Sequence, residues 1–228
     1  LAFDRCLGTA TTATGQVLAQ PGQKVADLAA QIAAVQGAAL NDNDLALMLV
    51  GMNDILEIYS GYPTTPRDQL LAEARARGAA LGTQVNALAL SGPRVVILTT
   101  HDLGLTPFAL AENTNTGDPG RAGLLSELSA ALNNRMSVTL INDGRLIGLV
   151  FADTEVQNMY RFPSRFGLAN ANDAACLTTA ALPDCRTNTL ATGATSTSHL
   201  WADDLRLGPV AQSRLGSQGA FRARNNPF

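Results

Sequence analysis

Three nearly continuous apolar runs stand out along the chain: "LALMLVG" (45–51), "RVVILTT" (94–100) and "RLIGLVFAD" (145–153). Apolar runs of this length, without alternating polar residues, are typical of parallel strands that are buried on both faces. We therefore expect three strands of one parallel sheet at these positions.

Apolar residues also recur at helical spacing between these runs. The stripe in the stretch after Pro66 consists of Leu70, Ala74, Gly78, Leu81, Val85 and Leu88. Thr65 before Pro66 predicts the start of this helix and "SGP" (91–93) its end. Further helices are expected at 25–36 and around a stripe of Leu124, Leu125, Leu128 and Leu132. Strands that alternate with helices predict an α/β fold of three layers, α/β/α, around a parallel sheet.

Residues 154–200 break this rhythm, because the stretch is rich in Asn, Thr, Ala and Pro. We expect it to be a long, loop-rich excursion that returns to the body of the protein just before Trp201. The length of 228 residues suits one large α/β domain, so residues 1–228 are predicted to form a single domain.

Composition and charge narrow the classes of function. Hydrophobic residues make up 46% of the chain and charged residues 15%, which is typical of a globular protein. The formal net charge is −3 and no run of basic residues occurs, so we expect no nucleic-acid partner. No apolar stretch approaches the ~20 residues of a membrane-spanning helix. The first residues do not read as a signal peptide, so any export signal is expected to have been removed.

The three cysteines bear on the compartment. Cys176 and Cys185 lie nine residues apart, and they are either a short disulfide or two unrelated buried thiols. The disulfide is the favoured interpretation and suggests a secreted or periplasmic protein. Cys6 is left over, as a free thiol or with a partner outside the chain.

Candidate chemistry lies just after the predicted strands, because ligands of open parallel sheets bind at the carboxyl ends of the strands. Gly51 permits a tight turn, after which the Asn53 amide can donate to an oxyanion. Alternatively, Asn53 and Asp54 simply cap the next helix. His101 follows the second strand. It is either a rim histidine bonded to solvent, or a residue that borders the substrate or serves as a catalytic base.

Four segments, taken together, resemble the SGNH (or GDSL) hydrolase family. "GMNDILEIY" (51–59) is similar to the family's block III, and "AQPGQKVADLAAQI" (19–32) to block II. "PSRFGLANANDAAC" (163–176) is similar to a segment that precedes the last block in secreted and autotransporter-type members. "WADDLRLGP" (201–209) resembles block V, which normally reads Asp-x-x-His. The resemblance runs from about residue 19 to about residue 216.

The resemblance implies a flavodoxin-like parallel sheet and the hydrolysis of carboxylic esters by a serine nucleophile. Asn53 and the Gly22 backbone N–H would then hold the oxyanion, and Asp203 would be the orienting acid of the triad. Gly51, Asp54 and His101 are expected to lie near the substrate, a small-molecule ester or acyl compound. Neither a metal nor a cofactor is expected, and the oligomeric state is left open.

The chain departs from the family pattern at the nucleophile. Block I of the family is a Gly-Asp-Ser sequence after a central first strand, and "GDS" occurs nowhere in this chain. We expect both the serine and its strand to lie upstream of Leu1. Without that strand the sheet would expose two unpaired edges and lose an apolar layer on both faces, which invites pairing through the edges.

The second departure is Arg206, which stands where block V has its histidine. A guanidinium stays protonated at physiological pH, so it cannot accept a proton from a serine. An ion pair between Asp203 and Arg206 is the expected outcome. The sequence therefore favours an ester hydrolase of doubtful competence. The alternative is a degenerate hydrolase that binds an acyl or glycan ligand. An autotransporter passenger domain is disfavoured because no barrel follows "RARNNPF".

Overall fold

The computed structural model describes residues 15–36, 40–177 and 185–225. Its centre is a parallel sheet in the order β1-β2-β3, formed by β1 (Leu45–Met48), β2 (Arg94–Leu98) and β3 (Ile147–Val150). The three predicted strands are confirmed, although each is shorter than its apolar run. The remainder of the first two runs follows the strand at its carboxyl end, whereas the third run also includes two residues before β3 and the first two residues of the helix α7 (Ala152–Arg161).

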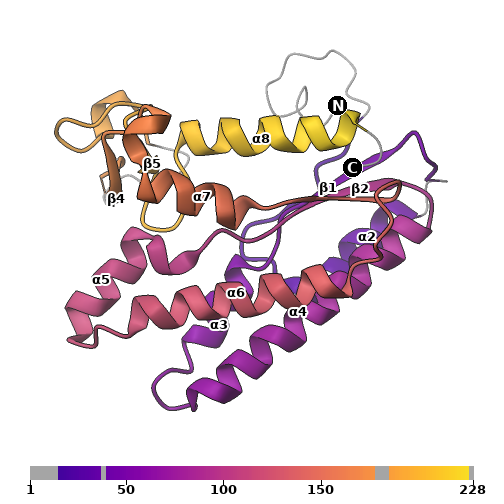
Figure 1. Ribbon diagram of the computed structural model, residues 1–228, viewed down its shortest axis with the longest axis horizontal. Helices are drawn as coiled ribbons and strands as arrows, with labels where there is room; N and C mark the ends of the chain where they lie inside the picture. Colours follow the sequence, from indigo (N-terminus) through magenta and orange to yellow (C-terminus); the bar gives the residue numbers. More distant parts are fainter. Residues whose placement is uncertain (1–14, 37–39, 178–184, 226–228) are drawn as a thin grey trace.

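One face of the sheet packs against the helices that the apolar stripes predicted (Figure 1). The predicted helices are α2 (Leu28–Gln36), which follows the short η1 (Val25–Asp27), and the long pair α4 (Arg67–Leu90) and α6 (Arg121–Thr139). The same face also carries α3 (Met52–Tyr59), η2 (Leu103–Leu105) and α5 (Pro107–Thr116), which no apolar stripe had predicted. Val95 and Ile97 of β2 lie in this core. None of the helices in the described ranges is long and apolar enough to cross a bilayer.

Glycine allows the two long helices to approach each other closely. A Cβ atom on Gly78 of α4 would lie 2.3 Å from the carbonyl oxygen of Leu132 in α6. The predicted stripe on α4 therefore meets the stripe on α6 directly. The start of α4 differs slightly from the prediction, because Pro66 rather than Thr65 is its N-cap residue.

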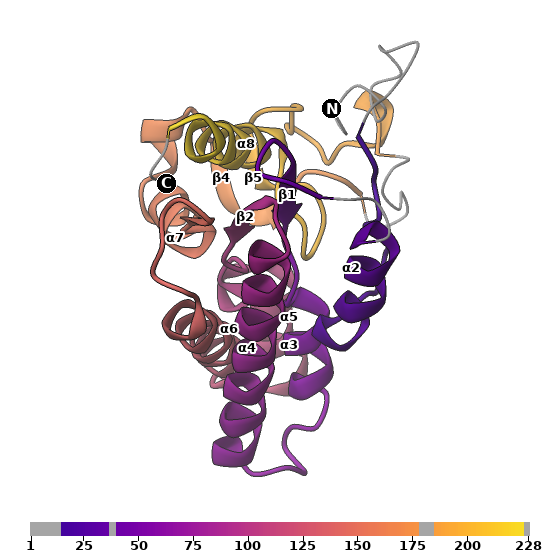
Figure 2. The same cartoon turned by 90° about the vertical axis from the view of Figure 1, so that its right-hand side faces the viewer.

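The opposite face of the sheet packs against α7 (Ala152–Arg161) and α8 (Pro209–Arg224). Val96 and Leu98 of β2 point to this side, where they join Trp201 and Leu215 in a second core cluster. Figure 2 shows α8 and α7 on one side of the strands and α3, α4 and α6 on the other. The α/β fold with helices on both faces is thus present, around a small sheet.

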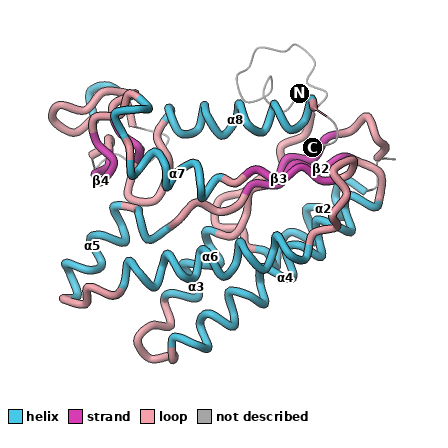
Figure 3. Tube along the Cα trace, viewed as in Figure 1, coloured by secondary structure: helices cyan, strands magenta, loops and turns pink. Residues whose placement is uncertain are grey.

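The stretch 154–200 is more regular than the sequence suggested (Figure 3). It holds most of α7, then η3 (Pro163–Phe166), β4 (Asn170–Ala174), η4 (Thr187–Thr189) and the start of β5 (His199–Trp201). β4 and β5 form a separate two-stranded parallel sheet. α7 was missed because most of its side chains are polar, and only Ala152, Val156 and Met159 are buried.

The predicted disulfide is confirmed. Cys176 and Cys185 are bonded, with their Cα atoms 5.7 Å apart. Cys6 lies outside the described residues, so its predicted role stays a prediction.

The outer edge of β1 carries exposed leucines. In the described part of the chain β1 pairs only with β2, and Leu45, Leu47 and Leu49 are 47%, 65% and 59% exposed. Leu47 pairs in register with Val96, so these leucines lie on the face of the sheet that α8 covers. α8 itself packs over β2 and β3. The edge strand therefore presents both a backbone edge and an apolar face.

Candidate functional site

Gly51 makes the turn that leads from β1 into α3. Its φ of +128° is a backbone conformation that side-chain-bearing residues rarely adopt. A Cβ atom at this position would lie 2.5 Å from the Oγ1 atom of Thr100, which follows β2 and donates to the Val50 carbonyl at 3.1 Å. The carboxyl ends of β1 and β2 are therefore held in direct contact, as the predicted site requires.

Asn53 and Asp54 do not cap α3. The N-cap residue is Gly51, and no side chain makes a capping bond. The Asn53 Nδ2 atom instead donates to the Gln23 carbonyl at 2.8 Å, and Asp54 Oδ2 accepts from the Val25 N–H at 3.0 Å. Both side chains thus reach the segment that contains Gly22. The structure brings the two predicted oxyanion donors onto adjoining pieces of chain.

Asp54 is occupied by protein contacts. It is 1% exposed and forms an ion pair with Arg77 of α4, at 3.2 Å. Burial raises the pKa of this carboxyl, against the opposing effects of the Val25 N–H and the Arg77 guanidinium. The carboxylate fastens η1 to α3 and α4, which explains why an acid follows Asn53 here.

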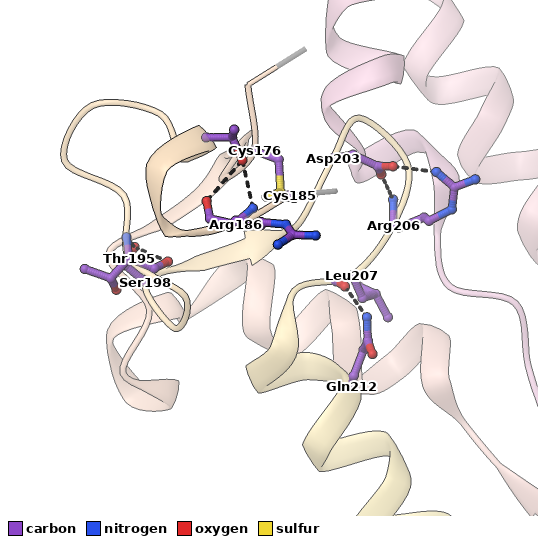
Figure 4. Close-up of a disulfide and its surroundings, with 10 residues drawn as sticks. Cys176, Cys185, Arg186, Thr195, Ser198, Asp203, Arg206, Leu207 and Gln212 are labelled. Carbon is purple, nitrogen blue, oxygen red and sulfur yellow. Dashed lines mark hydrogen bonds and ion pairs between the residues drawn. A yellow bond between two sulfur atoms is a disulfide. The ribbon is translucent and has the colours of Figure 1, made fainter. Parts of the chain in front are cut away.

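The predicted ion pair between Asp203 and Arg206 is confirmed (Figure 4). The Arg206 guanidinium donates to Asp203 Oδ2 at 2.5 Å. The other carboxylate oxygen, Oδ1, accepts from the backbone N–H groups of Leu205, at 3.0 Å, and Arg206, at 2.6 Å. Asp203 is therefore committed to its own turn and to a cation, while the Arg206 side chain is 55% exposed.

Two backbone carbonyls attach this turn, which we call the 202–207 loop, to the segment after β2. The Phe108 N–H donates to the Asp204 carbonyl at 2.9 Å, and His101 Nε2 contacts the Leu205 carbonyl at 3.1 Å. On the other side, the Cys176 N–H donates to the Ala202 carbonyl at 2.9 Å. The loop lies at the carboxyl end of β2, the edge at which Gly51 leaves β1.

His101 is not the solvent-bonded rim residue that was expected. It is only 7% exposed, and its ring lies 5.6 Å from the ring of Trp201. Because a carbonyl only accepts, Nε2 must carry the proton that is shared with Leu205. Burial lowers the pKa of His101 to about 4. A buried imidazole whose Nε2 is already a donor is poorly placed to act as the missing base.

We predict that His101 makes the protein acid-sensitive. The unfolded chain binds a proton on this residue near pH 6.5, whereas the folded protein does so only near 4. Its contribution to stability is therefore complete above pH 6.5 and is lost as the pH falls from 6.5 toward 4, by up to about 3 kcal/mol. Urea unfolding at pH 7 and pH 4.5 measures this. A His101→Gln variant should lose less stability over the same interval, and an equal loss would refute the assignment.

A buried polar network at the same sheet edge was missed by the sequence analysis. Asn133 of α6 accepts from the Thr100 N–H at 2.9 Å and donates to its carbonyl at 2.7 Å. Thr99 donates to Asp153, in the first turn of α7, at 2.8 Å. The sequence did contain a signal for this network. Asn133 is a polar residue on the apolar stripe of α6, two turns after Leu125, and a polar residue at such a position indicates a buried hydrogen-bonding partner.

The remaining histidine lies outside this arrangement. His199 Nδ1 contacts Ser198 Oγ at 2.8 Å, but this hydroxyl also bonds the backbone of Thr195 within its own turn.

Two grooves are also present, one between α4 and α6 and one along β3, α7 and α8. Neither groove is lined by a predicted site residue, so the site is an arrangement of loops at the sheet edge.

No group of three or more His, Cys, Asp or Glu side chains in the described ranges is arranged to hold a metal ion. The comparisons with known proteins add no assignment: no family model matches the chain, and no curated protein matches it.

Proposed function

We propose that the protein is an ester hydrolase of the SGNH, or GDSL, type that acts on carboxylic esters. One observation carries the proposal. The 202–207 loop is hydrogen-bonded to the segment after β2, and Thr100 in that segment contacts the turn that presents Asn53. The blocks that resemble the family in sequence are thus gathered at one end of a parallel sheet, where ligands of such sheets bind.

In the proposed reaction, a serine oxygen attacks the ester carbonyl carbon and forms a tetrahedral oxyanion. An asparagine amide has two N–H groups. One N–H of Asn53 binds the Gln23 carbonyl and fixes the side chain, which leaves the second for the oxyanion. The backbone N–H of Gly22, the residue before Gln23, would be the other donor. The proton of the serine hydroxyl passes to the departing alkoxide, which leaves as the alcohol. Water then hydrolyses the acyl-serine and releases the acid and the free serine.

We assign the serine to a further strand beside β1. In the family that the sequence resembles, the nucleophile follows a strand that neighbours the one ending in Gly-x-Asn-Asp. Among the described residues β1 pairs only with β2, and the side chains of Leu45, Leu47 and Leu49 are exposed, which supports this placement. A parallel strand would bond to that edge and continue the apolar face beneath α8.

A second candidate function is favoured by the ion pair of Asp203 and Arg206. Because Arg206 cannot take the serine proton, the inherited site would hold an acyl or glycan ligand without rapid turnover. Calorimetric titration with a non-cleavable ketone analogue of an ester tests this function. The disulfide supports a secreted or periplasmic location.

Asn53→Ala tests the hydrolase directly. Loss of an oxyanion donor typically lowers the rate ~10²–10³-fold, whereas loss of its bond to Gln23 costs only about 1 kcal/mol of stability. Hydrolysis of p-nitrophenyl acetate and urea unfolding measure the two effects, and a fluorophosphonate probe with mass spectrometry identifies the reactive serine. Asn172→Ala, which changes an exposed asparagine of β4, is the matched control. An unchanged rate in Asn53→Ala would remove the oxyanion role.

A further inference from the structure

Asp203 is connected to His101 through the backbone of one residue, Leu205. The Leu205 carbonyl receives the His101 Nε2–H at 3.1 Å, and the Leu205 N–H donates to Asp203 Oδ1 at 3.0 Å. The imidazole therefore grips the same residue that orients the carboxylate. Two contacts described above attach the turn to the segment after β2. One is the bond from the Phe108 N–H to the Asp204 carbonyl, and the other is this bond from His101 to the Leu205 carbonyl.

The surroundings of His101 make it a rigid anchor. The ring packs against Trp201, which is fully buried and donates through Nε1 to the Ala171 carbonyl at 2.7 Å. A side chain buried in this way loses little further conformational freedom when it forms its hydrogen bond, so the position of the bond is well defined. An exposed donor in the same place would hold the turn less firmly.

We infer that His101 is a positioning residue that holds the Asp203 carboxylate in place through Leu205. The inference rests on the proposed function for its catalytic consequence, but the mechanical link stands on the contacts alone. In a hydrolase with a working base, a shift of the loop would misplace the carboxylate that orients it. The rate of the chemical step would then fall, while substrate binding would change little.

Two variants separate the hydrogen bond from the aromatic packing. His101→Phe keeps an aromatic ring against Trp201 but removes the donor, and His101→Gln keeps an N–H at a position similar to Nε2. Hydrogen exchange at the Leu205 and Arg206 amides is the first measurement, because both bond to Asp203. We expect exchange about tenfold faster in His101→Phe, and close to the unchanged protein in His101→Gln.

The kinetic measurement uses the same variants in an Arg206→His background with p-nitrophenyl acetate. We expect His101→Phe to lower kcat about tenfold with little change in KM, and His101→Gln to restore it. If Arg206→His has no esterase activity, the proposed function fails while amide exchange still decides the inference. If the Leu205 amide of a folded His101→Phe exchanges as slowly as in the unchanged protein, the inference is overturned. If His101→Phe does not fold, His101→Met replaces it. Faster exchange of the Leu205 and Arg206 amides in a folded His101→Gln would also overturn the inference.

Discussion

Arg206→His is expected to hydrolyse p-nitrophenyl acetate ~10²–10⁴ times faster than the unchanged protein, which is the usual contribution of a positioned general base. An imidazole accepts a proton near neutral pH, whereas the guanidinium that now binds Asp203 does not. The new histidine would take over the carboxylate that Arg206 occupies. Its activity should therefore rise with pH through about 6.5, the ordinary pKa of the group.

Two further substitutions show whether the base itself is responsible. Arg206→Gln removes the cation without adding a base, and Arg206→Lys keeps a cation, so neither should gain activity. If Arg206→Gln gains as much as Arg206→His, opening the ion pair is the cause and the missing-base explanation is wrong. If the unchanged protein is already as fast as Arg206→His, another group accepts the proton.

Gly51→Ala is expected to lower the free energy of unfolding by about 3–5 kcal/mol, and it should be among the most damaging single changes at the sheet edge. Two costs add. The backbone φ of +128° is strained for alanine, and the new Cβ atom would lie 2.5 Å from Thr100 Oγ1 and 3.1 Å from Leu132 Cδ2. Thr100 is almost fully buried and has no room to retreat. Urea unfolding measures the loss.

Gly216→Ala is the matched control for this prediction. Gly216 lies within α8, and a Cβ atom there would meet nothing within 4 Å, so alanine should stabilise the protein by about 0.5–1 kcal/mol. In Gly51→Ala combined with Thr100→Ala, removing the hydroxyl relieves the steric contact while the φ strain persists. Thr100→Ala should therefore lower the free energy of unfolding less in the Gly51→Ala background than in the unchanged protein. A loss below about 1 kcal/mol in Gly51→Ala would show that the turn is not constrained as described.

The secondary structure of the central layers could be predicted well because its signals are local. Buried parallel strands and amphipathic helices leave periodic patterns in consecutive residues, and the stripe from Leu70 to Leu88 is one of them. The ion pair of Asp203 with Arg206 was predictable for the same reason, since the partners lie three positions apart within one turn. α7 and α8 were missed because their apolar positions are few, and their burial depends on the sheet face that they cover.

The site could be predicted only in part. The resemblance supplied Asn53, Gly22 and Asp203, but the contacts that hold Asn53 and His101 join residues that are far apart in sequence. The Asn53 amide bonds the Gln23 carbonyl, and His101 grips a carbonyl more than a hundred positions later. The residue types alone suggested a helix cap and a solvent-bonded histidine, and both interpretations were wrong, because side chains choose partners by proximity in three dimensions.

The sequence by itself determined the order of the three central strands and of the striped helices between them, the parallel sheet, the disulfide between Cys176 and Cys185, and the cation at position 206. Each of these follows from the identity and spacing of nearby residues. Only the tertiary structure decided what His101 does, which segments Asn53 and Asp54 hold, and that the outer edge of β1 is left uncovered among the described residues. These features depend on which surfaces meet when the layers pack. Those contacts join residues that are distant in sequence, so no single stretch of the chain predicts them.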